Sequence, residues 1–145
     1  MNLFTQIAVG TVVIIVTLIL QVVFIGIAIS ALKRFGEPLS NPPYLYKSIL
    51  AILLIVLWLI AGLSCSAWAW AGVFVMLGVF DGLEPALYFS VVTFTTLGYG
   101  DITLDPSWRL LASFAAVDGL IIFGLNSAFL VEFIARLRSA QDDHG

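Results

Sequence analysis

Two long stretches of the chain are apolar and contain no charged side chain: residues 3–32 and residues 48–80. A helix needs about 20 predominantly apolar residues to cross the hydrocarbon core of a bilayer, so each stretch is long enough to span a membrane. A third stretch, residues 107–137, is also long enough, although it contains the acidic residues Asp118 and Glu132. The pattern predicts an all-α membrane protein with three transmembrane helices.

The composition excludes several other classes. Hydrophobic residues make up 61% of the 145 residues and charged residues only 10%, whereas soluble domains are about 45–50% apolar and about 25% charged. The formal net charge of -3 leaves no basic surface for binding nucleic acid. No nucleophile and base are paired in an enzyme-like pattern, and the single histidine, His144, lies in the tail.

The segment between the second and third stretches, residues 81–106, is too polar and too rich in glycine to cross a membrane. Basic residues are concentrated in the 33–47 connection and directly after the third stretch, and such residues favour the cytoplasmic side. Both regions share that side only if residues 81–106 enter the membrane and return. We therefore expect a multi-pass protein of the cell (plasma or inner) membrane, with the N-terminus outside and the C-terminus cytoplasmic. A cleaved signal peptide is disfavoured because the first apolar run is about twice the usual length and lacks a basic start.

A short helix is expected over residues 84–95. Asp81 and Glu84 have the spacing of a capping box, and Pro85 suits a first helical turn. The carboxyl end of such a helix carries partial negative charge on its free carbonyl groups. That end would favour a nearby cation.

The sequence Thr-Leu-Gly-Tyr-Gly-Asp follows at residues 96–101. Glycine tolerates positive φ, so two glycines that alternate with other residues allow successive carbonyls to line one side. Four such strands around an axis would form stacked rings of oxygens that replace the hydration shell of a cation. A Gly-x-Gly sequence alone would indicate only a turn. Irregular backbone at membrane depth, however, is tolerated mainly where it is buried in protein or lines a watery path.

Residues 48–138 resemble the pore module of the potassium channel superfamily, because residues 95–101, Thr-Thr-Leu-Gly-Tyr-Gly-Asp, match its signature except at Leu97, where valine is usual. The resemblance implies an outer helix at 48–80, a re-entrant pore helix at 84–95, a selectivity filter at 96–101 and an inner helix at 107–138. It also implies the filter residues: K⁺ would be bound at Thr96, Leu97, Gly98 and Tyr99, with Gly100 completing the filter and Asp101 at the outer mouth.

The rest of the chain lies outside that module. We expect residues 1–32 to form an additional N-terminal transmembrane helix, residues 33–47 a cytoplasmic loop and residues 139–145 a short cytoplasmic tail. The loop cannot be helical throughout because prolines remove backbone donors and restrict the preceding residues. The sequence leaves three roles open for the additional helix: packing outside the outer helix, filling a gap between subunits, or binding a regulatory protein.

The inner helix contains two glycines, although glycine costs about 1 kcal/mol relative to alanine inside a helix. By the resemblance, Gly119 falls at the hinge of the family, and Gly124 follows in a similar pattern. A hinge and close packing against a neighbouring helix both account for these residues. Helical spacing places five residues on one broad face, which is either a cavity and gate or a bundle core: Leu120, Phe123, Ser127, Val131 and Ile134.

Asp118 is an ionisable residue in the middle of a predicted membrane span. Such residues are rare, and their presence indicates a functional role. We expect partners on the outer helix, either Ser64, Ser66 or a tryptophan. A structural hydrogen bond is favoured over proton sensing, because buried polar groups generally find partners.

By the resemblance, Val92 replaces a carboxylic acid that often holds the acid after the filter. Asp101 must then be held by another residue, and we expect Tyr88 or Trp108. In the sequence around the filter, four carboxylates (Asp81, Glu84, Asp101 and Asp105) against Arg109 leave a net charge of -3 per subunit, which favours cations.

The predicted function is a potassium-selective channel with no cofactor, in which K⁺ is the permeant ion. One pore loop supplies a quarter of a filter, so a homotetramer in the lipid bilayer is implied. No span carries the regularly spaced arginines of a voltage sensor. The alternatives are a weakly selective cation channel and a non-conducting regulatory or scaffold subunit.

Overall fold

A computed structural model describes residues 2–39 and 44–142. In this part of the chain there are four helices and no strand: α1 (Leu3–Leu39), α2 (Tyr44–Met76), α3 (Leu83–Phe94) and α4 (Arg109–Asp142). The helices α1, α2 and α4 each contain an apolar segment long enough to cross a membrane. The predicted fold class, with three long helices and one short one, is confirmed for the single chain.

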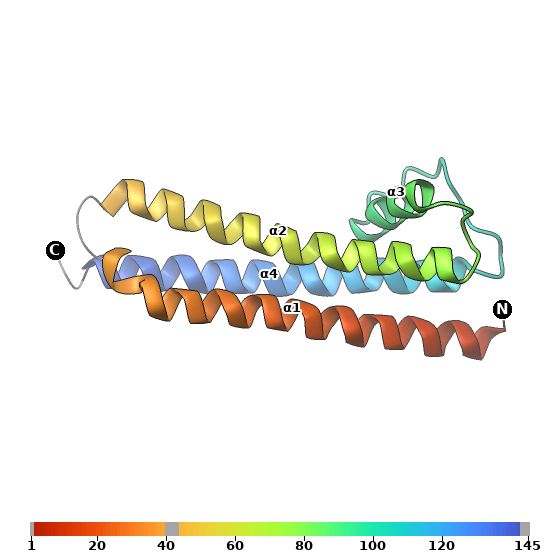
Figure 1. Ribbon diagram of the computed structural model, residues 1–145, viewed down its shortest axis with the longest axis horizontal. Coiled ribbons are helices and arrows are strands. Elements are labelled where there is room, and N and C mark those ends of the chain that lie inside the picture. Colours follow the sequence, from red (N-terminus) through yellow and green to blue (C-terminus); the bar gives the residue numbers. More distant parts are fainter. Residues whose placement is uncertain (1, 40–43, 143–145) are drawn as a thin grey trace.

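The three long helices run side by side, and α3 lies at one end of the bundle (Figure 1). Helices suit a membrane because they satisfy every backbone polar group within the segment. The start of α1 and the whole of α3 lie at the same end, and the end of α1, the start of α2 and the end of α4 lie at the other. The segment between α2 and α4 therefore leaves and returns at one end, as a re-entrant segment does.

The helix boundaries differ from the expected ones mainly between α1 and α2. Helix α1 continues to Leu39, so the connection is shorter than the expected loop at 33–47. Pro38 lies in the last turn of α1, where it removes a single backbone donor, and the helix ends one residue later. Residues 40–43, with the other two prolines of this connection, lie outside the described residues.

The remaining boundaries shift by a few residues. Helix α2 ends at Met76 rather than residue 80, because the chain turns at Gly78, which has a φ of 69°. Helix α4 begins at Arg109 after a turn in which the Trp108 amide donates to the Asp105 carbonyl. It continues to Asp142, so the expected tail at 139–145 is helical as far as it is described.

The start of α3 lacks the expected capping box. The N-cap is Gly82, in an extended conformation, and no side chain caps the helix. Pro85 nevertheless lies in the first turn, as expected. Helix α3 packs on α2 and α4, and a cluster of aromatic rings joins it to α2: Phe74 and Phe89 have ring centroids 5.4 Å apart in an edge-to-face arrangement.

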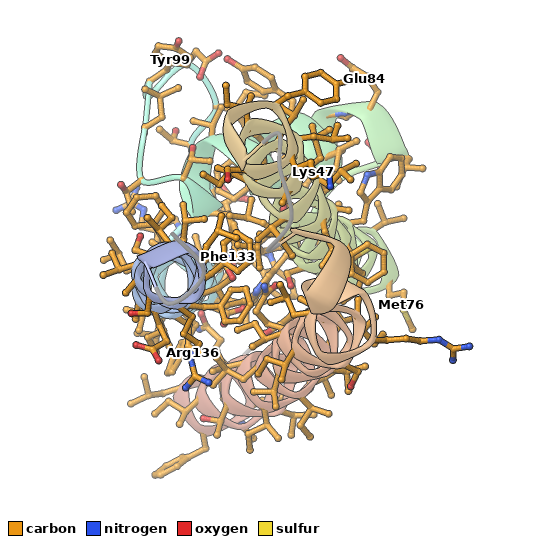
Figure 2. The ribbon with its side chains drawn as sticks, turned by 90° about the vertical axis from the view of Figure 1, so that its left-hand side faces the viewer. Lys47, Met76, Glu84, Tyr99, Phe133 and Arg136 are labelled. Atoms are coloured by element: carbon orange, nitrogen blue, oxygen red, sulfur yellow. The ribbon has the colours of Figure 1, made fainter. Side chains whose placement is uncertain are left out.

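Helix α1 buries one face and exposes the rest of its apolar surface. The buried positions are three, four or seven residues apart, which places them in one stripe along the helix: Gln6, Gly10, Val13, Thr17, Gln21 and Ala28. Within the described chain, α1 contacts α2 and α4 but not α3. Viewed along the bundle, Tyr99 in the loop after α3 lies on the side opposite α1 (Figure 2).

Candidate functional site

The segment directly after α3 has an unusual backbone. The φ angles are positive at every second residue: 58° at Thr96, 54° at Gly98 and 77° at Gly100. Leu97 and Tyr99 lie between them without a positive φ. This alternation flips the peptide planes relative to an ordinary strand, so that successive carbonyl oxygens can line one side. The structure thus shows the backbone conformation that the two glycines suggest.

Thr96 is the residue that sequence reasoning did not single out for this conformation. A β-branched residue with positive φ is a steric outlier, and such strain persists where the surroundings over-determine it. Here the Thr96 amide donates to the Thr93 carbonyl at 2.9 Å. The first strained residue of the segment is therefore bonded directly to the last turn of α3.

The Val92 carbonyl holds the next two residues of the segment. It accepts hydrogen bonds from the Leu97 amide at 3.0 Å and from the Gly98 amide at 3.1 Å. A helix leaves its last four carbonyls without intrahelical partners, so α3 supplies an acceptor that the following segment uses. Val92 contributes through its backbone, while its side chain is buried.

Asp101 is held by Tyr88 on α3, which is one of the two partners expected for it. The Tyr88 hydroxyl donates to Asp101 Oδ2 at 2.6 Å, and the Ile102 amide donates to Oδ1 at 3.0 Å. The hydrogen bond from Tyr88 is the main cause that lowers the pKa of Asp101, and the same bond raises the pKa of Tyr88. Trp108, the other candidate, packs instead against the hydrophobic core.

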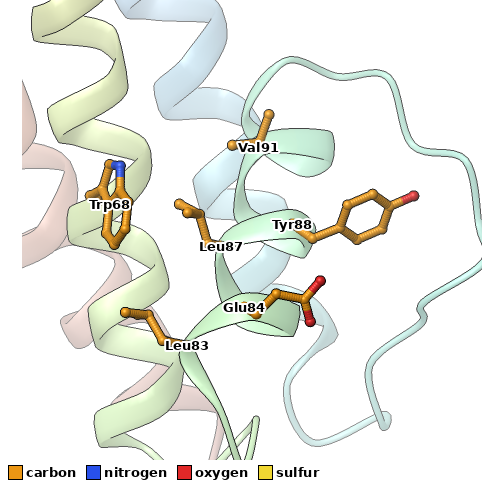
Figure 3. Close-up of a pocket in the computed structure, with 6 residues that line it drawn as sticks. All are labelled: Trp68, Leu83, Glu84, Leu87, Tyr88 and Val91. Carbon is orange, nitrogen blue, oxygen red and sulfur yellow. The ribbon is translucent and has the colours of Figure 1, made fainter.

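A shallow pocket between α2 and α3 lies beside this contact (Figure 3). The side chains of Leu83 and Leu87 face Trp68 on α2, whereas Tyr88 points away from α2 toward the loop after α3. One side of α3 is therefore attached to α2, and another side holds the loop.

The expected cavity face of α4 is largely uncovered in the single chain. Leu120, Phe123 and Val131 are exposed over 59%, 64% and 69% of their surfaces. Ser127 is also exposed, and its hydroxyl donates to the Phe123 carbonyl of its own helix at 2.9 Å. Ile134 is half-buried. Within one subunit, these residues do not form the core of the bundle, so the cavity and gate assignment stays a prediction.

Gly119 packs directly against the end of α3. A Cβ placed on this residue would lie 1.8 Å from the Phe94 carbonyl oxygen, at the end of α3. Close packing accounts for glycine here. Gly124, by contrast, has nothing within 4 Å of its Cβ position. A hinge at either residue stays a prediction.

Asp118 is fully buried between three helices. Its Oδ2 atom accepts hydrogen bonds from Thr17 Oγ1 on α1 at 2.6 Å and from Trp70 Nε1 on α2 at 2.7 Å. The expected tryptophan is thus a partner, whereas Ser66 donates to the Gly62 carbonyl instead. Thr17 was not anticipated, because it lies on α1 and the partners were expected on the outer helix.

Two further polar residues of α1 bond to α4. Gln6 Oε1 accepts from the Leu111 amide at 3.3 Å, in the first turn of α4, and Gln21 Nε2 donates to Asn126 Oδ1 at 2.6 Å. Polar side chains of this kind often join helices inside membranes. Their presence on one face of an otherwise apolar helix was the only sequence signal for this contact.

Charges lie at both ends of the site. The four carboxylates and the guanidinium around α3 are all exposed: Asp81, Glu84, Asp101, Asp105 and Arg109. Toward the end of α4, Arg136 Nε bonds to Glu132 Oε1 at 2.6 Å.

Three long apolar helices, a short helix at one end of the bundle and a following loop of alternating backbone conformation define a multi-pass helical membrane protein. The model of a family described as "Ion channel" matches residues 53–136, more than half of the chain. The chain therefore belongs to this ion channel family, and the match supports the potassium channel pore module inferred from the signature. Comparisons with curated proteins and with solved structures give no match.

Proposed function

We propose that the chain is a subunit of a potassium-selective channel, in which four copies surround one filter and K⁺ passes between their carbonyl oxygens. The observation that carries the proposal is the alternation of positive φ at Thr96, Gly98 and Gly100 within the sequence Thr-Leu-Gly-Tyr-Gly-Asp. Carbonyl rings in such a segment can replace the hydration shell of a potassium ion. The Thr96 hydroxyl would be the innermost ligand.

The exposed surfaces of the single chain fit this assembly. The segment 95–101 and the α4 residues Leu120, Phe123 and Val131 are exposed, although they belong to the predicted pore. One chain supplies one pore loop, and a closed ring requires several. Four copies would bring the local charge of -3 around α3 to about -12 at one mouth, which raises the local concentration of cations.

The same proposal orients the chain in a cell membrane. The end of α1, the start of α2 and the end of α4 lie at one end of the bundle, and the basic residues of the chain are concentrated in these segments. By the preference of basic residues for the cytoplasm, this end would be inside, and the N-terminus and the filter would be outside.

The test is ion flux from liposomes that contain the purified full chain, with potassium and sodium gradients compared in the same preparation. We expect potassium-selective flux that barium blocks. Gly98→Ala should abolish the flux, because alanine at a φ of 54° costs about 1–2 kcal/mol in each subunit. Gly26→Ala is the matched control, since Gly26 lies in α1 with nothing within 4 Å of its Cβ position.

Two outcomes would contradict the proposal. Equal potassium and sodium flux would indicate a weakly selective cation channel. No flux at any of several pH values, from protein that cross-linking shows to be tetrameric, would indicate a non-conducting subunit.

A further inference from the structure

We propose that Asp118 is a positioning residue for the filter: its bonds to Thr17 and Trp70 fix the inner helix α4 where Gly119 receives the end of α3. The proposal rests on the proposed function only in that residues 96–101 act as the filter. It gives the additional helix α1 a part in selectivity, although α1 does not contact α3 within the described chain.

The three side chains form a buried polar joint inside the bundle. Thr17, Trp70 and Asp118 come from three different helices, and each is exposed over 1% of its surface or less. Both donors bond to the same carboxylate oxygen, Oδ2. In a low-dielectric interior, hydrogen bonds are strong and a lost partner is costly. The joint therefore fixes the position of α4 relative to α1 and α2.

The next residue of α4 touches the end of the pore helix. Gly119 approaches Phe94 so closely that an added Cβ would lie 1.8 Å from its carbonyl oxygen. Phe94 is the last residue of α3, and Thr96, the first strained residue of the filter, follows two positions later. Neighbouring residues of a helix are about 100° apart around its axis. A rotation or shift of α4 at Asp118 would therefore move the surface on which α3 ends.

The other side of α3 is attached to the same part of α2. Ser90 Oγ donates to the Ala67 carbonyl at 2.7 Å, in a fully buried contact. Ala67 and Trp70 are three residues apart, so they lie on nearly the same face of α2. Helix α2 thus serves as a common reference: Ala67 fixes the pore helix, and Trp70 fixes the inner helix through Asp118. Thr17 on α1 bonds to the same carboxylate oxygen as Trp70 and so adds a third helix to the joint.

Two pairs of variants test the role of the joint. Thr17→Val removes the hydroxyl with almost no change of shape, and Thr11→Val makes the same change at an exposed position of α1. Asp118→Asn keeps one carbonyl oxygen, which can accept both bonds because both donors use Oδ2 and Oδ1 has no partner in the described structure. Asp118→Leu removes the acceptor.

Two measurements on the full chain in liposomes separate positioning from folding. The first is the ratio of potassium to sodium flux. The second is amide hydrogen exchange, compared between residues 95–101 and the part of α4 that follows Gly119, residues 120–135. An interhelical hydrogen bond in a membrane shifts such equilibria about threefold to tenfold. Thr17→Val should accelerate exchange in 95–101 and lower the flux ratio by a factor of that size.

The expected pattern is a change confined to the filter segment in Thr17→Val and Asp118→Leu, with Thr11→Val and Asp118→Asn like the parent protein. Exchange that rises equally in 95–101 and 120–135 would show a merely structural joint and overturn the proposal. Unchanged exchange and flux ratio in Thr17→Val would also overturn it. If the parent protein conducts no potassium, the proposed function fails, but the exchange measurement still decides whether the joint positions this segment.

Discussion

Replacing Gly119 by alanine tests the contact between the inner helix and the end of α3. The added Cβ would lie 1.8 Å from the Phe94 carbonyl oxygen, whereas favourable contact between heavy atoms begins at about 3.5 Å. The two helices would have to separate by about 1.7 Å, the difference between these distances. The obstacle is a backbone atom, so no side-chain rotation can relieve the overlap.

The free energy of unfolding should fall as a result. Overpacking of this kind costs about 1–3 kcal/mol, occasionally more, and alanine returns about 1 kcal/mol of helix propensity. Because the overlap is large, we expect a net loss of about 2 kcal/mol for Gly119→Ala. Gly124→Ala is the control on the same helix: nothing lies within 4 Å of its Cβ position, so it should be neutral or stabilising by up to about 1 kcal/mol.

The assay is thermal or denaturant unfolding of the purified protein in one detergent, with both variants compared to the parent chain. Potassium-to-sodium flux ratios in liposomes provide the second readout, since a displaced α3 should disturb the filter. Equal stability of Gly119→Ala and Gly124→Ala would refute the reasoning. A variant Gly119→Ala that keeps its stability and flux ratio but changes its open probability would favour the hinge.

Two further predictions concern hydrogen bonds at the filter end of the bundle. Tyr88→Phe removes the hydrogen bond that lowers the pKa of Asp101. This hydrogen bond favours the ionised carboxylate. The stabilisation that it provides is therefore present above the ordinary pKa of aspartate and is lost as the pH falls through the lowered pKa of Asp101. In Tyr88→Phe, potassium flux should therefore decline at a higher external pH than in the parent protein, and superimposable pH profiles would contradict this. Gln6→Leu leaves the Leu111 amide in the first turn of α4 without its acceptor. It should lower the free energy of unfolding by about 0.5–2 kcal/mol, as the loss of a helix cap does. Unfolding measurements should show the loss, and Gln6→Glu, which keeps the acceptor, should be close to the parent protein.

Helix α1 is joined to the inner helix α4 by three side-chain hydrogen bonds. Gln6, Thr17 and Gln21 each bond to α4, at Leu111, Asp118 and Asn126. These contacts extend from residue 111 to residue 126, along the first half of α4. A movement of α4 must either carry α1 with it or break these bonds, so α1 is an integral part of the bundle.

Much of the candidate site was predictable because its signals are contiguous in the chain. The length of the three apolar stretches required membrane helices, and the sequence of residues 95–101 indicated the filter and its two glycines. The bond between Tyr88 and Asp101 was also within reach, since the two residues are only 13 positions apart. The capping box at Asp81 was not formed, because the helix starts after Gly82 without a side-chain cap.

The sequence by itself determined the membrane class, the number of long helices and the place of the segment with alternating backbone conformation, since these depend on local hydropathy and on a short motif. Only the tertiary structure decided that Thr17 bonds to Asp118, 101 positions away, and that Gly119 receives the Phe94 carbonyl. The physical reason lies in the solvent: lipid is as apolar as a protein interior, so hydropathy does not distinguish the faces of a membrane helix that contact lipid from those that contact protein. The pairing of polar residues depends on how each helix is rotated about its axis and how far it is shifted along that axis. Only the packing of the helices fixes these two quantities.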